Sequence, residues 1–186
     1  MLQNGGQILA IADHTGWAVA LVADGGGQVS LSRRIALVGE GLPTMPHHGA
    51  GQRLPSAEGV ALVEQVRQSA VAEAEARLAE LATEVPGIAA IALRACPTMP
   101  ATVAETLASY WAQTRADGVM YRRALAGAAE ARGWAVHWFD KRTAASQALA
   151  LLGKTGLTAA EAQARAAFGP PWTADHRMAL NAAITA

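Results

Sequence analysis

Short apolar runs separated by turn-forming residues open the chain. Residues 7–13 (Gln-Ile-Leu-Ala-Ile-Ala-Asp), 17–22 and 28–38 each have the length and apolar content of a strand. The breaks between them contain Gly16 and the run Gly25-Gly26-Gly27, and glycines in such positions are typical of tight turns. The pattern predicts three consecutive antiparallel strands.

Longer periodic segments alternate with two further apolar runs in the rest of the chain. Apolar and small residues repeat at steps of three and four from Ser56, a residue type that caps helices, to Glu84. This repeat predicts one long helix over residues 56–84. Residues 88–93 and 134–140 have the pattern of two more strands. We expect helices over the remaining segments, at residues 102–114, 117–132, 143–152, 158–168 and from 173 to the end.

Residues 39–55 follow neither the helical nor the strand period. They are rich in glycine and proline and include the adjacent histidines His47 and His48. Such a composition is typical of a surface loop. We therefore expect both histidines on a loop, from which they could reach an active site.

The order of these elements predicts the fold class. Three strands in a meander pair as antiparallel neighbours, and strands separated by helices join a sheet as parallel neighbours through right-handed crossovers. The expected fold is α/β, with a five-stranded mixed sheet flanked by helices on both sides. The chain has 186 residues and no repeat or low-complexity linker, so we expect a single domain over residues 1–186.

Composition narrows the classes of function. Hydrophobic residues make up 52% of the chain and charged residues 16%, as expected of a folded globule. Fifteen basic residues balance fifteen acidic ones, so no overall positive field favours nucleic acid. Cys96 is the only cysteine, which excludes an intramolecular disulfide and a cluster of thiolate metal ligands. No signal peptide or membrane span is evident, so we expect a cytoplasmic protein, and small residues on the helices favour a homodimer.

Motifs near both ends of the chain resemble a known family. Residues 8–19 place a strand, Asp13, a short turn with Gly16 and a second strand in succession. The tail, residues 174–180, begins a helix with Asp175 and His176. With the element order, these segments resemble the RNase H-like superfamily, and within it the RuvC-type Holliday-junction resolvases. The resemblance covers most of the chain as topology and these two segments as motif.

The resemblance implies a metal-dependent hydrolysis of DNA or RNA. Such enzymes hold two divalent cations, Mg²⁺ or Mn²⁺, which bind the attacking water and the leaving oxygen of a phosphodiester. Magnesium prefers hard oxygen ligands, so carboxylates from several elements must converge. By this resemblance Asp13 corresponds to the acid of the first strand and Asp175 to the first acid of the last helix, and Asp140 lies near the third acid. All three are candidate catalytic residues and metal ligands.

Two positions depart from the family pattern. Arg94 stands about where the acid of the fourth strand is expected, and Met178 stands three residues after Asp175, where the resolvases usually have an aspartate. A guanidinium among carboxylates competes with a cation and pairs with an acid, here Asp13, Asp140 or Asp175. The hypothesis is that a guanidinium has replaced the metal.

Three functions remain open at this point. The first is a metal-dependent nuclease acting on structured nucleic acid. The second is a catalytically degenerate RNase H-like domain that binds nucleic acid or a protein partner. The third is a small-molecule enzyme on a related α/β fold, using His47, His48 and Arg94. His176 is a further candidate, although its position favours a structural or solvated role over that of a ligand. Arg122 and Arg123 are expected at the surface, where they would bind phosphate only by converging with other arginines.

Overall fold

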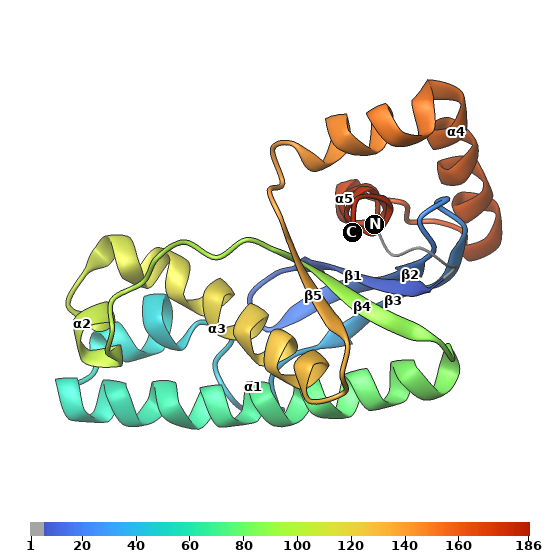
Figure 1. Ribbon diagram of the computed structural model, residues 1–186. Coiled ribbons are helices and arrows are strands. Elements are labelled where there is room, and N and C mark those ends of the chain that lie inside the picture. The colour runs from blue at the N-terminus through green and yellow to red at the C-terminus, as the bar shows by residue number, and fades with distance from the viewer. Residues whose placement is uncertain (1–5) are drawn as a thin grey trace.

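The computed structural model describes residues 6–186 and places a five-stranded mixed sheet between two layers of helices (Figure 1). The order of the strands is β3-β2-β1-β4-β5. The first three are antiparallel neighbours, and β4 and β5 run parallel to β1. The predicted sheet is therefore confirmed. The strand bounds are Gln7–Asp13 (β1), Trp17–Ala23 (β2), Val29–Ala36 (β3), Ile88–Arg94 (β4) and Ala135–Phe139 (β5).

The helices cover both faces of the sheet (Figure 1). Helices α1 (Ser56–Glu84) and α3 (Tyr110–Glu130) pack against each other and share one hydrophobic cluster with the sheet. Helices α4 (Ala144–Phe168) and α5 (Ala174–Ile184) share a second cluster on the opposite face. The short helix α2 (Val103–Leu107) lies beside the N-terminal half of α1. Among residues 6–186 no helix has the length and hydrophobicity needed to cross a membrane.

The alternation of side chains along β1 explains the two clusters. Leu9 and Ile11 belong to the cluster under α1 and α3, whereas Ala10 and Ala12 belong to the cluster under α5. Successive strand residues point to opposite faces, so both faces are apolar, as expected of a central strand covered on both sides. The alanines let α5 approach the sheet closely, and this brings the first turn of α5 near the end of β1.

Gly16 makes the turn after Asp13 possible. Its backbone has a φ of 82°, and a Cβ atom there would lie 2.5 Å from Cγ2 of Thr44. Its carbonyl oxygen accepts a hydrogen bond from the backbone N–H of Leu37. Only glycine combines a positive φ with this close approach. The Asp-His-Thr-Gly segment therefore fixes the direction in which the chain leaves β1.

Two predicted helix boundaries are wrong. The break expected between residues 114 and 117 lies instead at Ala108 and Ser109, where the Ser109 side chain accepts a hydrogen bond from the backbone N–H of Ala112 and so caps α3. Asp117, expected near a helix start, lies inside α3 and is buried. Ser56 is the first residue of α1, while Pro55 occupies the N-cap position without a side-chain cap.

Two further expectations are met only in part. The break expected within residues 143–168 is present as a kink at Gly153, whose φ of 67° is not helical, but the second part of α4 begins before residue 158. The expected loop of residues 39–55 contains two short helical turns, Pro46–Ala50 and Gly51–Arg53. His47 lies in the first turn and is buried, not displayed on the surface, because a carboxylate of α3 binds this segment.

Candidate functional site

Asp13 lies where β1 and its parallel neighbour β4 end. The carboxyl ends of adjacent parallel strands meet at one edge of a sheet, and here they bring Asp13 next to Arg94, the last residue of β4. The Arg94 Nη2 atom donates a hydrogen bond of 2.8 Å to Oδ2 of Asp13, whose side chain is only 1% exposed. One of the ion pairs considered for Arg94 from the sequence is therefore present.

Arg122 of α3 is a second cation at the same carboxylate. Its Nε atom lies 3.4 Å from Oδ2 of Asp13 and donates a hydrogen bond to the carbonyl oxygen of Gly118. Its Nη1 atom donates to the carbonyl oxygens of Arg94 and Ala95. Arg122 is thus buried, contrary to the surface position expected from the sequence. Burial lowers the pKa of Arg122, and the Asp13 carboxylate opposes that shift. Asp13, Arg94 and Arg122 are called the Asp13 cluster below.

The donor set around Asp13 does not fit a two-metal centre. Its Oδ2 atom contacts two guanidinium groups, and its buried Oδ1 atom has no hydrogen-bond donor among residues 6–186. A single remaining oxygen is far short of the several hard ligands that Mg²⁺ requires. Over the described range, no group of three or more His, Cys, Asp or Glu side chains is arranged to hold a metal ion.

Asp175 lies in the first turn of α5 and pairs with His14, the residue after Asp13. The distance from His14 Nε2 to Asp175 Oδ2 is 3.1 Å. The start of the last helix therefore reaches the end of β1, as the resemblance implies, but a histidine connects the two. His14 is not among the site residues expected from the sequence, where its position directly after Asp13 is the one signal that points to it.

Asp140 is engaged in a local ion pair. Its Oδ2 atom lies 2.6 Å from Nη2 of Arg142, and its Oδ1 atom accepts a hydrogen bond from the backbone N–H of the same residue. The hydrogen bonds from Arg142 lower the pKa of Asp140 to about 2. Asp140 lines a small cavity with His137 and Thr185 and contacts no member of the Asp13 cluster within ion-pair distance.

His176 has a structural contact at the start of α5. Its Nδ1 atom accepts a hydrogen bond from the backbone N–H of Thr173, the N-cap residue. Its ring lies 5.2 Å from that of Trp172. Burial lowers the pKa of His176, and the nearby Asp175 carboxylate opposes the shift. The neutral imidazole, which this hydrogen bond requires, is therefore favoured.

His47 and His48 belong to a separate network on another side of α3. The Asp117 Oδ1 atom accepts hydrogen bonds from the backbone N–H of His47 at 2.9 Å and from its Nδ1 at 2.8 Å. Its Oδ2 atom accepts the backbone N–H of His48 at 3.1 Å. Asp117 thus ties the loop before α1 to α3. The sequence offered no sign of this contact, which joins residues far apart in the chain.

An aromatic and basic surface continues from the Asp13 cluster. The His14 ring stacks on Trp17 at a centroid distance of 4.0 Å and an angle of 4°. The guanidinium of Arg34 lies 3.8 Å from the centroid of the same indole. Trp17 and Arg34 line a cavity of about 360 Å³ together with Trp172. These groups are called the Trp17 surface below.

The chain is similar in structure to solved proteins of known fold. No protein-family model matches the chain, and no curated protein matches it. A solved structure of Thermus thermophilus RuvC matches over 96% of this chain and 92% of its own, with a TM-score of 0.51 and 15% sequence identity. The fold is RuvC-like. At this identity the likeness extends to the fold alone, and the RuvC-like, RNase H-like fold class expected from the sequence is confirmed.

Within this fold, the site differs from the pattern that the resemblance implies at the end of the fourth strand. Asp13 and Asp175 lie at the ends of the two elements to which the resemblance assigned acids, and His14 brings these elements into contact. Arg94 ends the fourth strand and points its guanidinium at Asp13. Arg94, which stands about where the resemblance implies an acid, therefore places a cation beside Asp13 at this end of the sheet.

The thiol of Cys96 offers a way to probe the cluster. Burial raises the pKa of Cys96, while the positive charges of Arg122, Arg123 and Arg94 oppose the shift. We expect iodoacetamide to alkylate Cys96 with a pH midpoint above that of a free cysteine, and Arg94→Gln to raise this midpoint further. Alkylation rates measured by mass spectrometry over a series of pH values test both expectations. A midpoint below the free-thiol value would contradict the burial argument.

Proposed function

We propose that this chain is a RuvC-like domain that binds nucleic acid without metal-dependent cleavage. The observation that supports this most strongly is the contact of two guanidinium groups with the Asp13 carboxylate. Two cations next to one acid disfavour a further divalent cation and favour an anion. The Asp13 cluster thus serves as a structural and phosphate-binding unit in the place of a metal centre.

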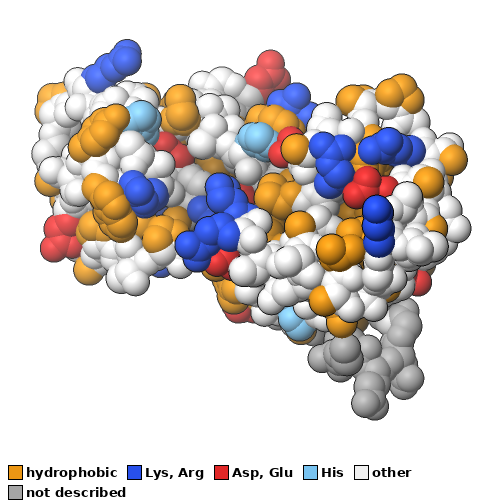
Figure 2. Space-filling view, turned by 90° about the horizontal axis from the view of Figure 1, so that it is seen from above, with side chains coloured by type: hydrophobic (Ala, Val, Ile, Leu, Met, Phe, Trp, Pro, Cys, Tyr) orange, Lys and Arg blue, Asp and Glu red, His pale blue; other side chains and the backbone are white. Residues whose placement is uncertain are grey.

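The charge around the cluster favours a phosphodiester. Arg123 follows the buried Arg122 and is exposed, and its charge acts on Cys96 together with those of Arg122 and Arg94. The Asp13 carboxylate pairs with two of these guanidiniums, those of Arg94 and Arg122. Figure 2 shows Lys and Arg side chains near the middle of the face seen from above, with acidic side chains beside some of them. A local basic surface is therefore compatible with the zero net charge of the chain.

The Trp17 surface supplies the other contacts that unpaired nucleotides use. Proteins that bind single strands combine basic groups along the backbone with aromatic and arginine surfaces against the bases. His14 joins this surface to Asp13 through the chain and to Asp175 through its ion pair. The proposed ligand is therefore branched or partly single-stranded nucleic acid, and the RuvC-like fold makes a DNA junction the first to test.

Binding should persist without metal and depend on Arg94. We expect fluorescence anisotropy in EDTA to show binding of a labelled four-way DNA junction, with affinity falling steeply as salt rises. Arg94→Gln should reduce the slope of log Kd against log salt by about one, whereas Arg94→Lys should retain it. Arg165→Gln, on α4 and paired with Glu161, is the matched control and should change nothing.

Two outcomes would reject the proposal. The first is an absence of salt-sensitive binding to junction, duplex and single-stranded DNA and RNA alike, which leaves a protein partner as the alternative. The second is DNA cleavage with Mn²⁺ that disappears in Asp13→Asn, because such cleavage requires the carboxylate to bind a metal.

A further inference from the structure

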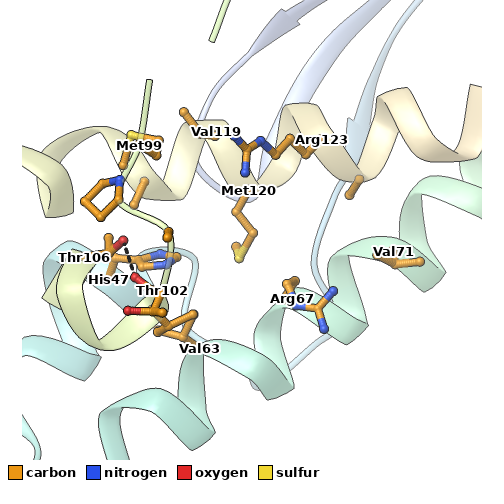
Figure 3. Close-up of a pocket in the computed structure, with 15 residues that line it drawn as sticks. His47, Val63, Arg67, Val71, Met99, Thr102, Thr106, Val119, Met120 and Arg123 are labelled. Atoms are coloured by element: carbon orange, nitrogen blue, oxygen red, sulfur yellow. Dashed lines mark hydrogen bonds between the residues drawn. The ribbon is translucent and has the colours of Figure 1, made fainter. Parts of the chain in front are cut away.

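A pocket of about 330 Å³ lies between α1, α2 and α3, apart from the Asp13 cluster (Figure 3). Its volume is near the lower limit of ordinary ligand sites. Apolar side chains form much of its wall, notably Val63, Val119, Met99 and Met120. It therefore has the size and lining of a site for a small molecule with an apolar body.

Three nitrogen-bearing side chains converge on this pocket, and its lining contains no Asp or Glu. Arg67 comes from α1 and Arg123 from α3, and Figure 3 shows their guanidiniums on the same side of the pocket. Arg67 also pairs with Glu64 at 2.7 Å, which offsets part of its charge. Arg123 has no ion pair with any residue of the described chain. An uncompensated guanidinium beside an apolar wall favours an anionic ligand.

His47 provides a fixed polar group at the other end of the pocket. Its side chain is 7% exposed and is held by Asp117. A carboxylate only accepts hydrogen bonds, so Nδ1 of His47 carries the proton in this contact and Nε2 is the ring nitrogen left for a ligand. Figure 3 places the His47 ring next to Thr102 and Thr106 on the pocket wall. The polar groups are thus preorganised before any ligand binds.

We propose that this pocket binds a small organic anion with an apolar body, its charged group at Arg123 and Arg67 and its body against the methionines and valines. This function is distinct from nucleic-acid binding, although Arg123 of α3 contributes positive charge to both sites. The His47 side chain lines the end of the pocket away from the two arginines.

Octanoate and 1-octanol are suitable probes, since they share the apolar chain and differ in charge. Isothermal titration should show one octanoate bound per chain with a Kd of about 5 mM or tighter, the affinity expected for a ligand of this size. We expect 1-octanol to bind at least about tenfold more weakly, because it lacks the group that pairs with the arginines.

Variants separate the charged and apolar contributions. Arg123→Met and Arg67→Met should each weaken octanoate binding several-fold without affecting 1-octanol, and Ala101→Phe, at the exposed rim of the pocket, should weaken both. Arg115→Met, on the same helix but stacked on Trp111 outside the pocket, is the control and should have no effect. Equal affinity for the two probes, or octanoate binding unchanged in both Arg123→Met and Arg67→Met, would overturn the proposal.

Discussion

Asp13→Asn is expected to destabilise the protein by about 3–5 kcal/mol, the usual cost of removing one partner from a buried ion pair. The asparagine has nearly the shape of the aspartate, so the change isolates the charge. It leaves the guanidinium of Arg122, whose side chain is 6% exposed, without its counter-ion. Denaturation in urea, with the m-value unchanged, measures the loss.

The sign of this result distinguishes the two interpretations of Asp13. In a cluster of carboxylates awaiting metal, neutralising one acid relieves repulsion and raises stability in EDTA. In the Asp13 cluster it removes attraction and lowers stability. Asp140→Asn is the matched control, because its partner Arg142 is 82% exposed and exposed ion pairs contribute little. Stabilisation by Asp13→Asn would show that the carboxylate is not serving as the counter-ion of these arginines.

The second large effect is expected at Asp117, where replacement by alanine should cost about 3–5 kcal/mol. The change leaves three donors of the His47–His48 segment without an acceptor, two of them buried at His47. We expect amide hydrogen exchange to accelerate in residues 46–53 before it accelerates in the sheet, since the loop loses its attachment to α3.

Two comparisons test this interpretation of Asp117. Asp117→Asn keeps one acceptor oxygen and should cost less than alanine. Asp24→Ala removes a carboxylate that also accepts two backbone N–H groups, from Gly26 and Gln28, but in an exposed turn. It should therefore have only a small effect. Equal losses of unfolding free energy in the Asp24 and Asp117 variants would mean that burial of the Asp117 hydrogen bonds contributes no additional stability.

The sheet was predictable because its signals are local. Short apolar runs, the glycines of two turns and the position of Asp13 at a strand end can all be recognised within a few residues. The ion pair of Arg94 with Asp13 could also be predicted, because both residues end strands that pair in parallel. Parallel neighbours bring such positions together without any knowledge of side-chain packing.

The other buried residues of these two networks, Asp117 and Arg122, come from α3. Their positions depend on where this helix begins and on which of its faces packs against the sheet. A start at Asp117 would have placed this residue in a first turn, where acids are ordinary. The true start at Tyr110 places Asp117 one helical turn before Tyr121 in a buried face. Arg122 lies on the face of α3 that packs against the end of β1, and the start of the helix does not determine which face this is. The misplaced boundary therefore concealed the role of Asp117, and the unknown packing face of α3 concealed that of Arg122.

The two outer strands of the sheet have consequences for self-association. A β-strand with an unpaired side can recruit another chain by backbone hydrogen bonding. Here β3 carries Arg33 and Arg34 near its middle, and β5 is only five residues long. The positive charges on β3 and the short length of β5 both oppose the pairing of further strands from another chain at the edges of the sheet. If two copies associate, we therefore expect contact through helical surfaces, and the outer strands should keep the chain from polymerising edge to edge.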